Sequence, residues 1–170
     1  MTPPAASRRQ SGPGQLAFLL AQLGGLAAMR FAERLAPLGL SPPQAGLLRA
    51  IDGDAGRSQQ AVAAQLGLLP SRLVALIDEL ERDGLVERRQ NPADRRHHAL
   101  YLTADGEQRL RDIGRVATEH GADYFASLDD HERTALAELL GKLATQHGLA
   151  PGVHPAYRML GADSQAGRVE

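Results

Sequence analysis

Cysteine and tryptophan are absent from this chain of 170 residues. Without cysteine the protein cannot form disulfides, bind a metal through thiolates, use a cysteine nucleophile or sense oxidants through a thiol. Aromatic residues of all kinds make up only 4% of the sequence, so leucine and alanine must fill the core. Because these two residues favour helices over strands, we expect a mainly α-helical protein.

The sequence also has few features of a membrane or secreted protein. No apolar run approaches the roughly 20 residues that cross a bilayer, and the N-terminal stretch MTPPAASRRQSGPG has no apolar segment like that of a signal peptide. The prediction is therefore a cytoplasmic protein with no membrane partner.

Sequence patterns of enzymes are missing as well. We find no phosphate-binding glycine loop, zinc-protease helix, nucleophile elbow or pair of catalytic carboxylates. His120 and Asp123 lie three residues apart on one predicted helix, a weak pattern for a metal site that fits a solvent-exposed or dimer-lining pair better. We expect no catalytic activity, no cofactor and no bound metal.

Composition and periodicity divide the chain into five segments. Residues 1–14 are rich in proline, serine and glycine, which predicts a disordered arm. Residues 15–40 are predicted to form an amphipathic helix, because leucines and alanines recur at three- and four-residue steps. Residues 41–103 carry several short elements, residues 104–148 carry two longer helices, and residues 149–170 are predicted to form an irregular tail.

Apolar stripes on the first and last helices need burial. Asp129 and Glu132 are predicted to cap the last helix. The stripe of the first helix contains Leu16, Leu20 and Leu23, and that of the last contains Leu136, Leu139, Leu140 and Leu143. A module this small has little surface of its own to cover both stripes, so helices of a partner chain would supply it. The terminal segments are therefore predicted to be dimerisation helices.

Two short helices joined by a tight turn are predicted between Ser58 and Gly84. Ser58 caps the first, Gly67 ends it, and Pro70 begins the second. One face of the second helix is apolar, with Leu73, Leu76, Ile77 and Leu80, while the opposite face carries Ser71, Arg72, Ala75, Asp78, Glu79 and Arg82. Two helices with one uncovered polar face are the layout of a helix-turn-helix.

A β-hairpin follows directly, with strands in LVERRQ and HALYL and the tip NPADRRH between them. The net charge of the chain is only −1, but this hairpin carries Arg88, Arg89, Arg95 and Arg96 against two acids, Glu87 and Asp94. A helix-turn-helix followed by a basic hairpin is a winged helix-turn-helix, which can place one helix in the major groove and the hairpin tip beside it. Residues 41–103 are therefore predicted to bind DNA.

The run GLVERRQNPADRRHHALYLTADGEQRL resembles the wing and following helix of the MarR family of bacterial transcription regulators, and SQQAVAAQLGLLPSRLVALIDELERDGL resembles that family's helix-turn-helix. The resemblance implies a homodimer that binds a pseudo-palindromic operator in double-stranded DNA. It also implies a repressor that a small anionic or aromatic effector releases from DNA, through a cleft between the dimerisation and DNA-binding regions.

The resemblance also assigns roles to individual residues. In the wing, Arg96 would enter the minor groove, Asp94 would steady the hairpin through an ion pair, and Arg88, Arg89 and Arg95 would contact phosphates or brace the hairpin. In the recognition helix, Ser71, Arg72 and Ala75 would meet DNA. Ala75 and Leu69 depart from the family pattern, which has a long polar residue and a capping residue there, so we expect base recognition to depend on Arg72 and the wing.

The sequence is also consistent with three alternatives to a ligand-released repressor. The protein could be a winged-helix regulator that responds to a metal, one that responds to no ligand, or a winged-helix module that binds proteins and not DNA. The effector site is also open: Phe18, Arg30, Phe31, Arg34 and Arg49 could line a ligand cleft, but each taken singly fits core packing or a dimer contact better, and they are not assigned as a site.

Overall fold

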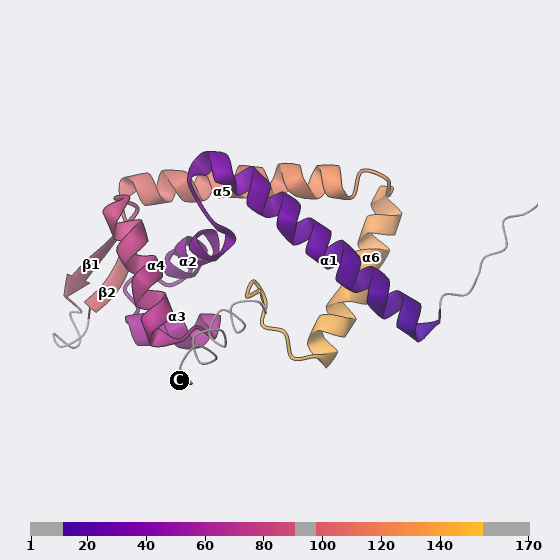
Figure 1. The fold of residues 1–170 in the computed structure, drawn as a ribbon, viewed down its shortest axis with the longest axis horizontal. Helices are drawn as coiled ribbons and strands as arrows, with labels where there is room; N and C mark the ends of the chain where they lie inside the picture. The colour runs from indigo at the N-terminus through magenta and orange to yellow at the C-terminus, as the bar shows by residue number, and fades with distance from the viewer. Residues whose placement is uncertain (1–11, 91–97, 155–170) are drawn as a thin grey trace, which may run out of the picture.

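The computed structural model describes residues 12–90 and 98–154. The elements in chain order are α1 (Pro13–Leu35), η1 (Ala36–Leu38), α2 (Pro42–Asp52), α3 (Gln59–Leu66), α4 (Pro70–Arg82), β1 (Val86–Gln90), β2 (His98–Leu102), α5 (Ala104–Tyr124) and α6 (Asp130–Gln146). Helices α2, α3 and α4 and the two strands form a lobe at one end, from which α1 and α5 extend toward α6 (Figure 1). The expected mainly helical winged fold is confirmed.

Polar caps begin the helices where the sequence predicts them. The side chain of Ser58 accepts a hydrogen bond from the amide three residues on (3.2 Å), and Thr103 accepts one from Gly106 (3.0 Å). Asp129 and Glu132 cap α6 reciprocally, at 2.9 and 3.0 Å. These bonds satisfy first-turn amides that have no partner inside the helix.

Helix ends differ slightly from the expected ones. α1 begins at Pro13, two residues before the predicted Gln15, because proline suits a first helical turn. Gly67 ends α3 with φ of 67°, the left-handed conformation that glycine tolerates best. The rest of the predicted N-terminal arm and most of the predicted tail lie outside the described residues.

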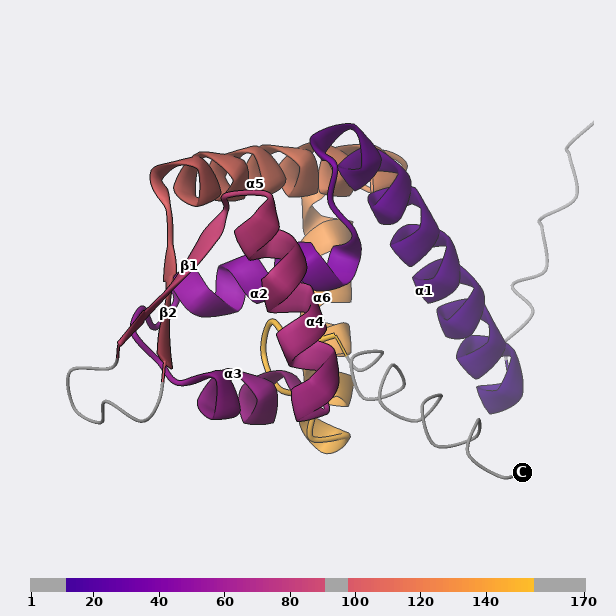
Figure 2. The ribbon, with the colours of Figure 1, turned by 60° about the vertical axis from the view of Figure 1, so that its left-hand side comes forward.

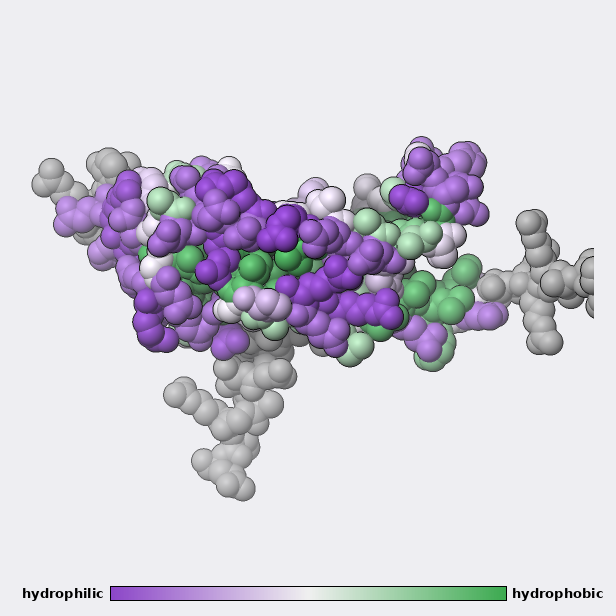
Figure 3. All heavy atoms as spheres, turned by 90° about the horizontal axis from the view of Figure 1, so that it is seen from above, coloured by the Kyte–Doolittle hydropathy of each residue, from purple (hydrophilic) through white to green (hydrophobic). Residues whose placement is uncertain are grey.

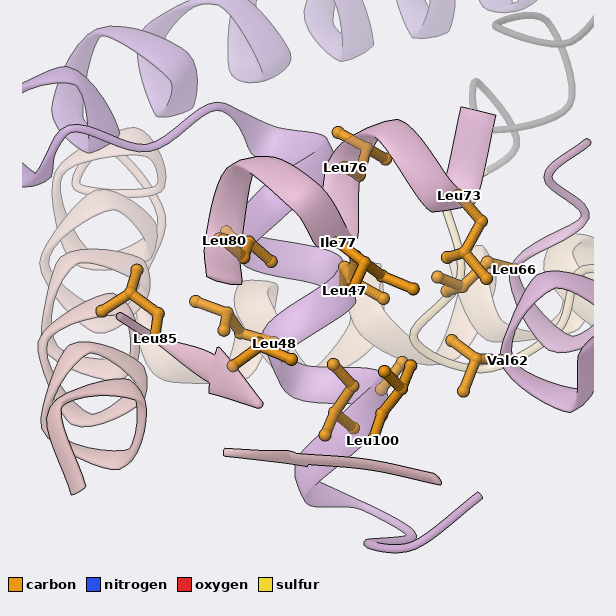
Figure 4. Packing of buried hydrophobic residues seen from close by; sticks show 14 of the residues in the cluster. Leu47, Leu48, Val62, Leu66, Leu73, Leu76, Ile77, Leu80, Leu85 and Leu100 are labelled. Atoms are coloured by element: carbon orange, nitrogen blue, oxygen red, sulfur yellow. The ribbon is translucent and has the colours of Figure 1, made fainter. Parts of the chain in front are cut away.

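The core lies between α2, α3, α4 and the hairpin (Figure 4). As predicted, one stripe of α4 is buried, with each of its members at most 2% exposed: Leu73, Leu76, Ile77 and Leu80. Leu47 and Leu48 of α2 and Leu100 of β2 complete the contact. Full burial of such a side chain contributes about 1.5–3 kcal/mol, so this cluster holds α4 with its opposite face free.

Backbone hydrogen bonds hold the hairpin on the lobe. β1 and β2 pair antiparallel, with Arg88 opposite Leu100. The amide of Leu100 also donates to the carbonyl of Arg57 (3.1 Å), and its carbonyl accepts from Gly56 (3.0 Å) in the α2–α3 connection. At the base of the hairpin the amide of Thr103 donates to a carbonyl just before β1 (3.2 Å). These bonds decide where the strands leave the lobe.

Within the single chain the terminal leucines remain exposed, and their burial by a partner chain stays a prediction. Leu16, Leu20 and Leu23 of α1 are more than half exposed, and α6 contains no buried residue. On α6, Leu139, Leu140 and Leu143 are exposed and Leu136 is half-buried. Apolar side chains gather at the end of the molecule next to the N-terminus (Figure 3). The reason is that no described part of the chain covers these faces.

α1 also corrects the expectation that no segment approaches membrane-spanning character. By length and composition, the helix Pro13–Leu38 is apolar enough to cross a bilayer. The segment has no long continuous apolar run, but it is rich in leucine and alanine and its only charged residues are Arg30, Glu33 and Arg34, so its average hydropathy is high. An exposed apolar helix of this kind also suits the contact between two protein chains.

Candidate nucleic-acid interface

The N-terminal half of α4 presents an uncovered polar face. Ser71, Arg72 and Ala75 are all exposed, opposite the buried leucine stripe. Leu69 occupies the cap position and makes no side-chain cap hydrogen bond, as its apolar side chain requires. An incoming phosphate oxygen could therefore reach the first-turn amides without displacing a capping side chain.

The acids of α4 lie in its C-terminal half, where other side chains bind them. Gln44 of α2 donates to a carboxylate oxygen of Glu79 at 2.9 Å. Asp78 and Glu81 both form ion pairs with Arg88 of β1. Because Asp78 and Glu81 share the positive charge of Arg88, this pair of carboxylates repels DNA phosphates less than two free carboxylates would.

Arg88 braces the wing against the recognition helix. Its two terminal nitrogens contact Asp78 and Glu81 separately, and its side chain is only 19% exposed. The backbone amide of Arg88 also donates to Glu81, at 3.4 Å. Two roles were expected for Arg88, phosphate contact or bracing of the hairpin. In this structure its guanidinium braces the hairpin.

Arg89 is placed differently, on the exposed side of the hairpin. Its side chain is 57% exposed, pairs with Glu87, and lies over the ring of Tyr101 with 4.6 Å between the guanidinium carbon and the ring centroid. A cation held over an aromatic face keeps its outer edge available for another ligand. Arg89 therefore remains a candidate phosphate contact.

The other wing residues cannot be placed. Asp94, Arg95 and Arg96 lie outside the described residues, so their predicted roles stay predictions from the sequence. The last described pair of the hairpin is Gln90 opposite His98.

Two contacts of the interface were missed by the sequence reasoning. Arg89 faces Ala99 across the strands, so Tyr101 is its diagonal neighbour on the same face, and this pairing could have been found from the strand register. The bond between Gln44 and Glu79 joins residues 35 positions apart, and no local pattern indicates it.

A second polar cluster joins α1 to α5. Arg34 forms an ion pair with Asp123 at 2.5 Å, and the rings of Phe31 and Tyr124 lie on either side of His120, each 5.6 Å from it. Burial, followed by the charges of Arg34 and Arg30, lowers the pKa of His120, while Asp123 opposes this effect. Among the described residues, no group of three side chains could hold a metal, so the weak metal pattern gains no support.

A cavity of about 510 Å³ opens where η1 and α5 meet the lobe. Its walls come from η1, the end of α4 and α5, and include Leu38, Leu85, Asp83, Arg109 and Asp112. The side chain of Arg109 donates to the carbonyl of Leu38 across it. None of the five residues that the sequence suggested for a ligand cleft lines this cavity.

Comparison with known proteins agrees with this geometry. A family model described as MarR family matches residues 38–97. A protein of Thauera aromatica assigned to transcriptional regulation of the hcr operon is 35% identical over 140 residues, which cover 81% of this chain and 84% of the relative.

Solved structures give the same answer. The transcriptional repressor CouR bound to a 23-mer DNA duplex has a TM-score of 0.69 and 31% identity, over 82% of this chain and 99% of its own. CouR of Rhodococcus jostii RHA1 bound to p-coumaroyl-CoA has a TM-score of 0.66 and 31% identity, over 79% of this chain and 93% of its own. The sequence match and the shared winged helix-turn-helix together show that this chain belongs to the MarR family of transcriptional regulators.

Proposed function

We propose that this regulator is a homodimeric, cytoplasmic repressor that binds a pseudo-palindromic operator in double-stranded DNA and is released by a small anionic or aromatic effector. The observation that carries the proposal is the free face of α4 at Ser71, Arg72 and Ala75, with the acids of the same helix bonded to Gln44 and Arg88. The repressor CouR, 31% identical, has been solved on a DNA duplex.

The exposed leucines support the homodimer. Leu20 of α1 and Leu139 of α6 are 51% and 57% exposed, and apolar surface of this kind favours association at roughly 25 cal/mol for each Å² removed from water. A second copy of the chain presents the same two stripes, so it can cover them by an exchange of equivalent contacts about a twofold axis. A dimer contact of this kind accounts for the exposed apolar surface of α1 without a membrane.

Binding to duplex DNA as a function of salt tests the proposal. Affinity should fall steeply as salt rises, because arginine contacts release counterions from phosphates. Arg72→Ala and Arg96→Ala should each weaken operator binding by about 1–3 kcal/mol, without unfolding the protein. Arg111→Ala is a matched control, since Arg111 is exposed on α5 and bonds only to Gln108 on its own helix in the described structure. Binding that is absent or insensitive to salt would instead favour a protein-interaction module.

The effector is tested by thermal unfolding. A ligand that prefers the folded state raises the melting temperature by mass action. CouR has been solved with p-coumaroyl-CoA, and the cavity beside Arg109 falls within the usual range of roughly 300–1,000 Å³ for ligand sites. Phenolic acids and their thioesters should stabilise the protein and release DNA, whereas stabilisation by divalent metals alone would favour the metal-responsive alternative.

A further inference from the structure

The chain that follows α6 turns back and contacts the DNA-binding lobe. Gly148 adopts φ of 62°, and the amide of Leu149 donates to the carbonyl of Ala144 at 2.9 Å, which ends α6 and reverses the chain. The segment from His147 to Val153, called the strap below, then runs from the end of α6 toward α3 (Figures 1 and 2). Together with Gln65, Leu66 and Gly67 at the end of α3, it lines a small cavity of about 70 Å³.

Arg49 holds the strap from the lobe. This residue lies in the last turn of α2, and one terminal nitrogen of its guanidinium donates to the carbonyl of Gly152 at 2.5 Å. Hydrogen bonds from an ionised donor are stronger than neutral ones. Gly152 has φ of 72°, and a Cβ built on it would lie 3.3 Å from the same nitrogen, so glycine permits both the turn and the close approach.

Val153 adds an apolar contact at the same place. Its side chain is half-buried and packs against the core cluster of the lobe, which includes Leu66. A turn bond from the amide of Val153 to the carbonyl of Ala150 (3.2 Å) shapes the strap locally. The strap is thus held by one charged and one apolar contact, on α2 and on the core.

The position of the strap has a mechanical consequence. α1 and α5 join the lobe on the side of the hairpin base and η1, whereas the strap reaches it near α3, and both ribbon views agree on this separation (Figures 1 and 2). A body attached on one side can rotate about that attachment. A second attachment on another side restricts the rotation.

We infer that Arg49 is a positioning residue for operator binding: through the strap it sets the orientation of the winged lobe relative to α6. The inference rests on the proposed function, in which α6 belongs to the dimerisation region. In a dimer, the lobe orientation decides the separation of the two recognition helices and hence the spacing of the half-sites that both can reach. If the lobe is already held in this orientation, operator binding does not have to offset the entropy lost in fixing it.

The test is a selection of operators from random duplex DNA by the full-length wild-type chain and by variants. Arg49→Ala removes the donor, and Gly152→Val obstructs the same contact from the strap, so two unrelated changes should act alike. Arg49→Lys keeps a cationic donor and should retain much of the wild-type behaviour. Arg111→Ala removes an equal charge elsewhere, and its selected duplexes should match those of the wild type.

The wild type should enrich duplexes with one half-site spacing. Arg49→Ala and Gly152→Val should enrich a broader range of spacings and bind the wild-type operator about three- to tenfold more weakly, with the same salt dependence. Unchanged spacing in both variants overturns the inference. A salt slope lowered by about one in Arg49→Ala also overturns it, because that result identifies Arg49 as a direct phosphate contact. Failure of the wild type to enrich any duplex overturns the proposed function itself.

Discussion

The guanidinium of Arg88 on β1 forms an ion pair with Glu81 on α4, and this contact joins the wing directly to the recognition helix. A second carboxylate, that of Asp78, binds the other terminal nitrogen of the same guanidinium. The wing and α4 therefore share this polar contact in addition to the apolar core beneath them. Their relative orientation is a property of the lobe before DNA arrives, which lowers the cost of ordering both on the operator.

Arg88→Met should weaken DNA binding, because Arg88 fixes the wing on α4. Loss of the double ion pair should lower the free energy of unfolding by about 1–2 kcal/mol, a modest figure because both carboxylates are partly exposed. Fluorescence anisotropy over a salt series should give lower affinity with an unchanged salt slope. A slope reduced by about one would mean that Arg88 contacts a phosphate and the bracing role is secondary.

Gly106→Ala should be strongly destabilising. A Cβ at this position would lie 2.0 Å from the carbonyl oxygen of Leu85, where backbone leaves no room to move. Separation of α5 from the hairpin base should lower the free energy of unfolding by about 2–4 kcal/mol, as measured by denaturant titration. Gly114→Ala on the same helix is the control, because nothing lies within 4 Å of its added Cβ, and there alanine should be neutral or stabilising. Equal effects in the two variants would refute the close approach.

Leu20→Asp and Leu139→Asp should each shift the protein from dimer to monomer. A carboxylate placed in an apolar contact loses its hydration without gaining a partner, which opposes association. Analytical ultracentrifugation gives the mass directly. Val74→Asp changes an exposed apolar residue on α4, outside the proposed contact, and should leave the dimer intact. A dimer that persists in both leucine variants would exclude α1 and α6 as its interface.

Acid should weaken the protein through His120. The folded state holds this pKa below its usual value of 6.5, so the unfolded chain binds the proton more readily. The stability due to neutral His120 is complete above pH 6.5 and is lost as the pH falls from there toward the lowered pKa. Thermal unfolding between pH 7.5 and 5.5 should therefore vary less in His120→Gln than in wild type. His131→Gln, at an exposed position on α6, should keep the wild-type pH dependence.

Much of the secondary structure follows from the sequence alone. The capping side chains of Ser58, Thr103 and Asp129 bond to amides within one turn of themselves, and the leucine stripe of α4 has the helical period. Such signals are local, so they determine an element without knowledge of its neighbours. The same is true of the hairpin, whose strands Val86–Gln90 and His98–Leu102 agree within one residue with the predicted LVERRQ and HALYL.

Three features depended on the tertiary structure. From its position in the sequence, Arg88 could contact a DNA phosphate or brace the hairpin. Only its ion pairs with Asp78 and Glu81 on another element show the bracing contact. Arg49 could line a ligand cleft by its sequence, but a residue 103 positions away accepts its hydrogen bond. The leucines of α6 have a core pattern, yet no part of the chain that the structure describes buries them. The chemistry of a side chain and the periodicity of its helix or strand can be read from the local sequence. The residue that it contacts depends on how elements far apart in the chain pack together, and this contact determines what the side chain does.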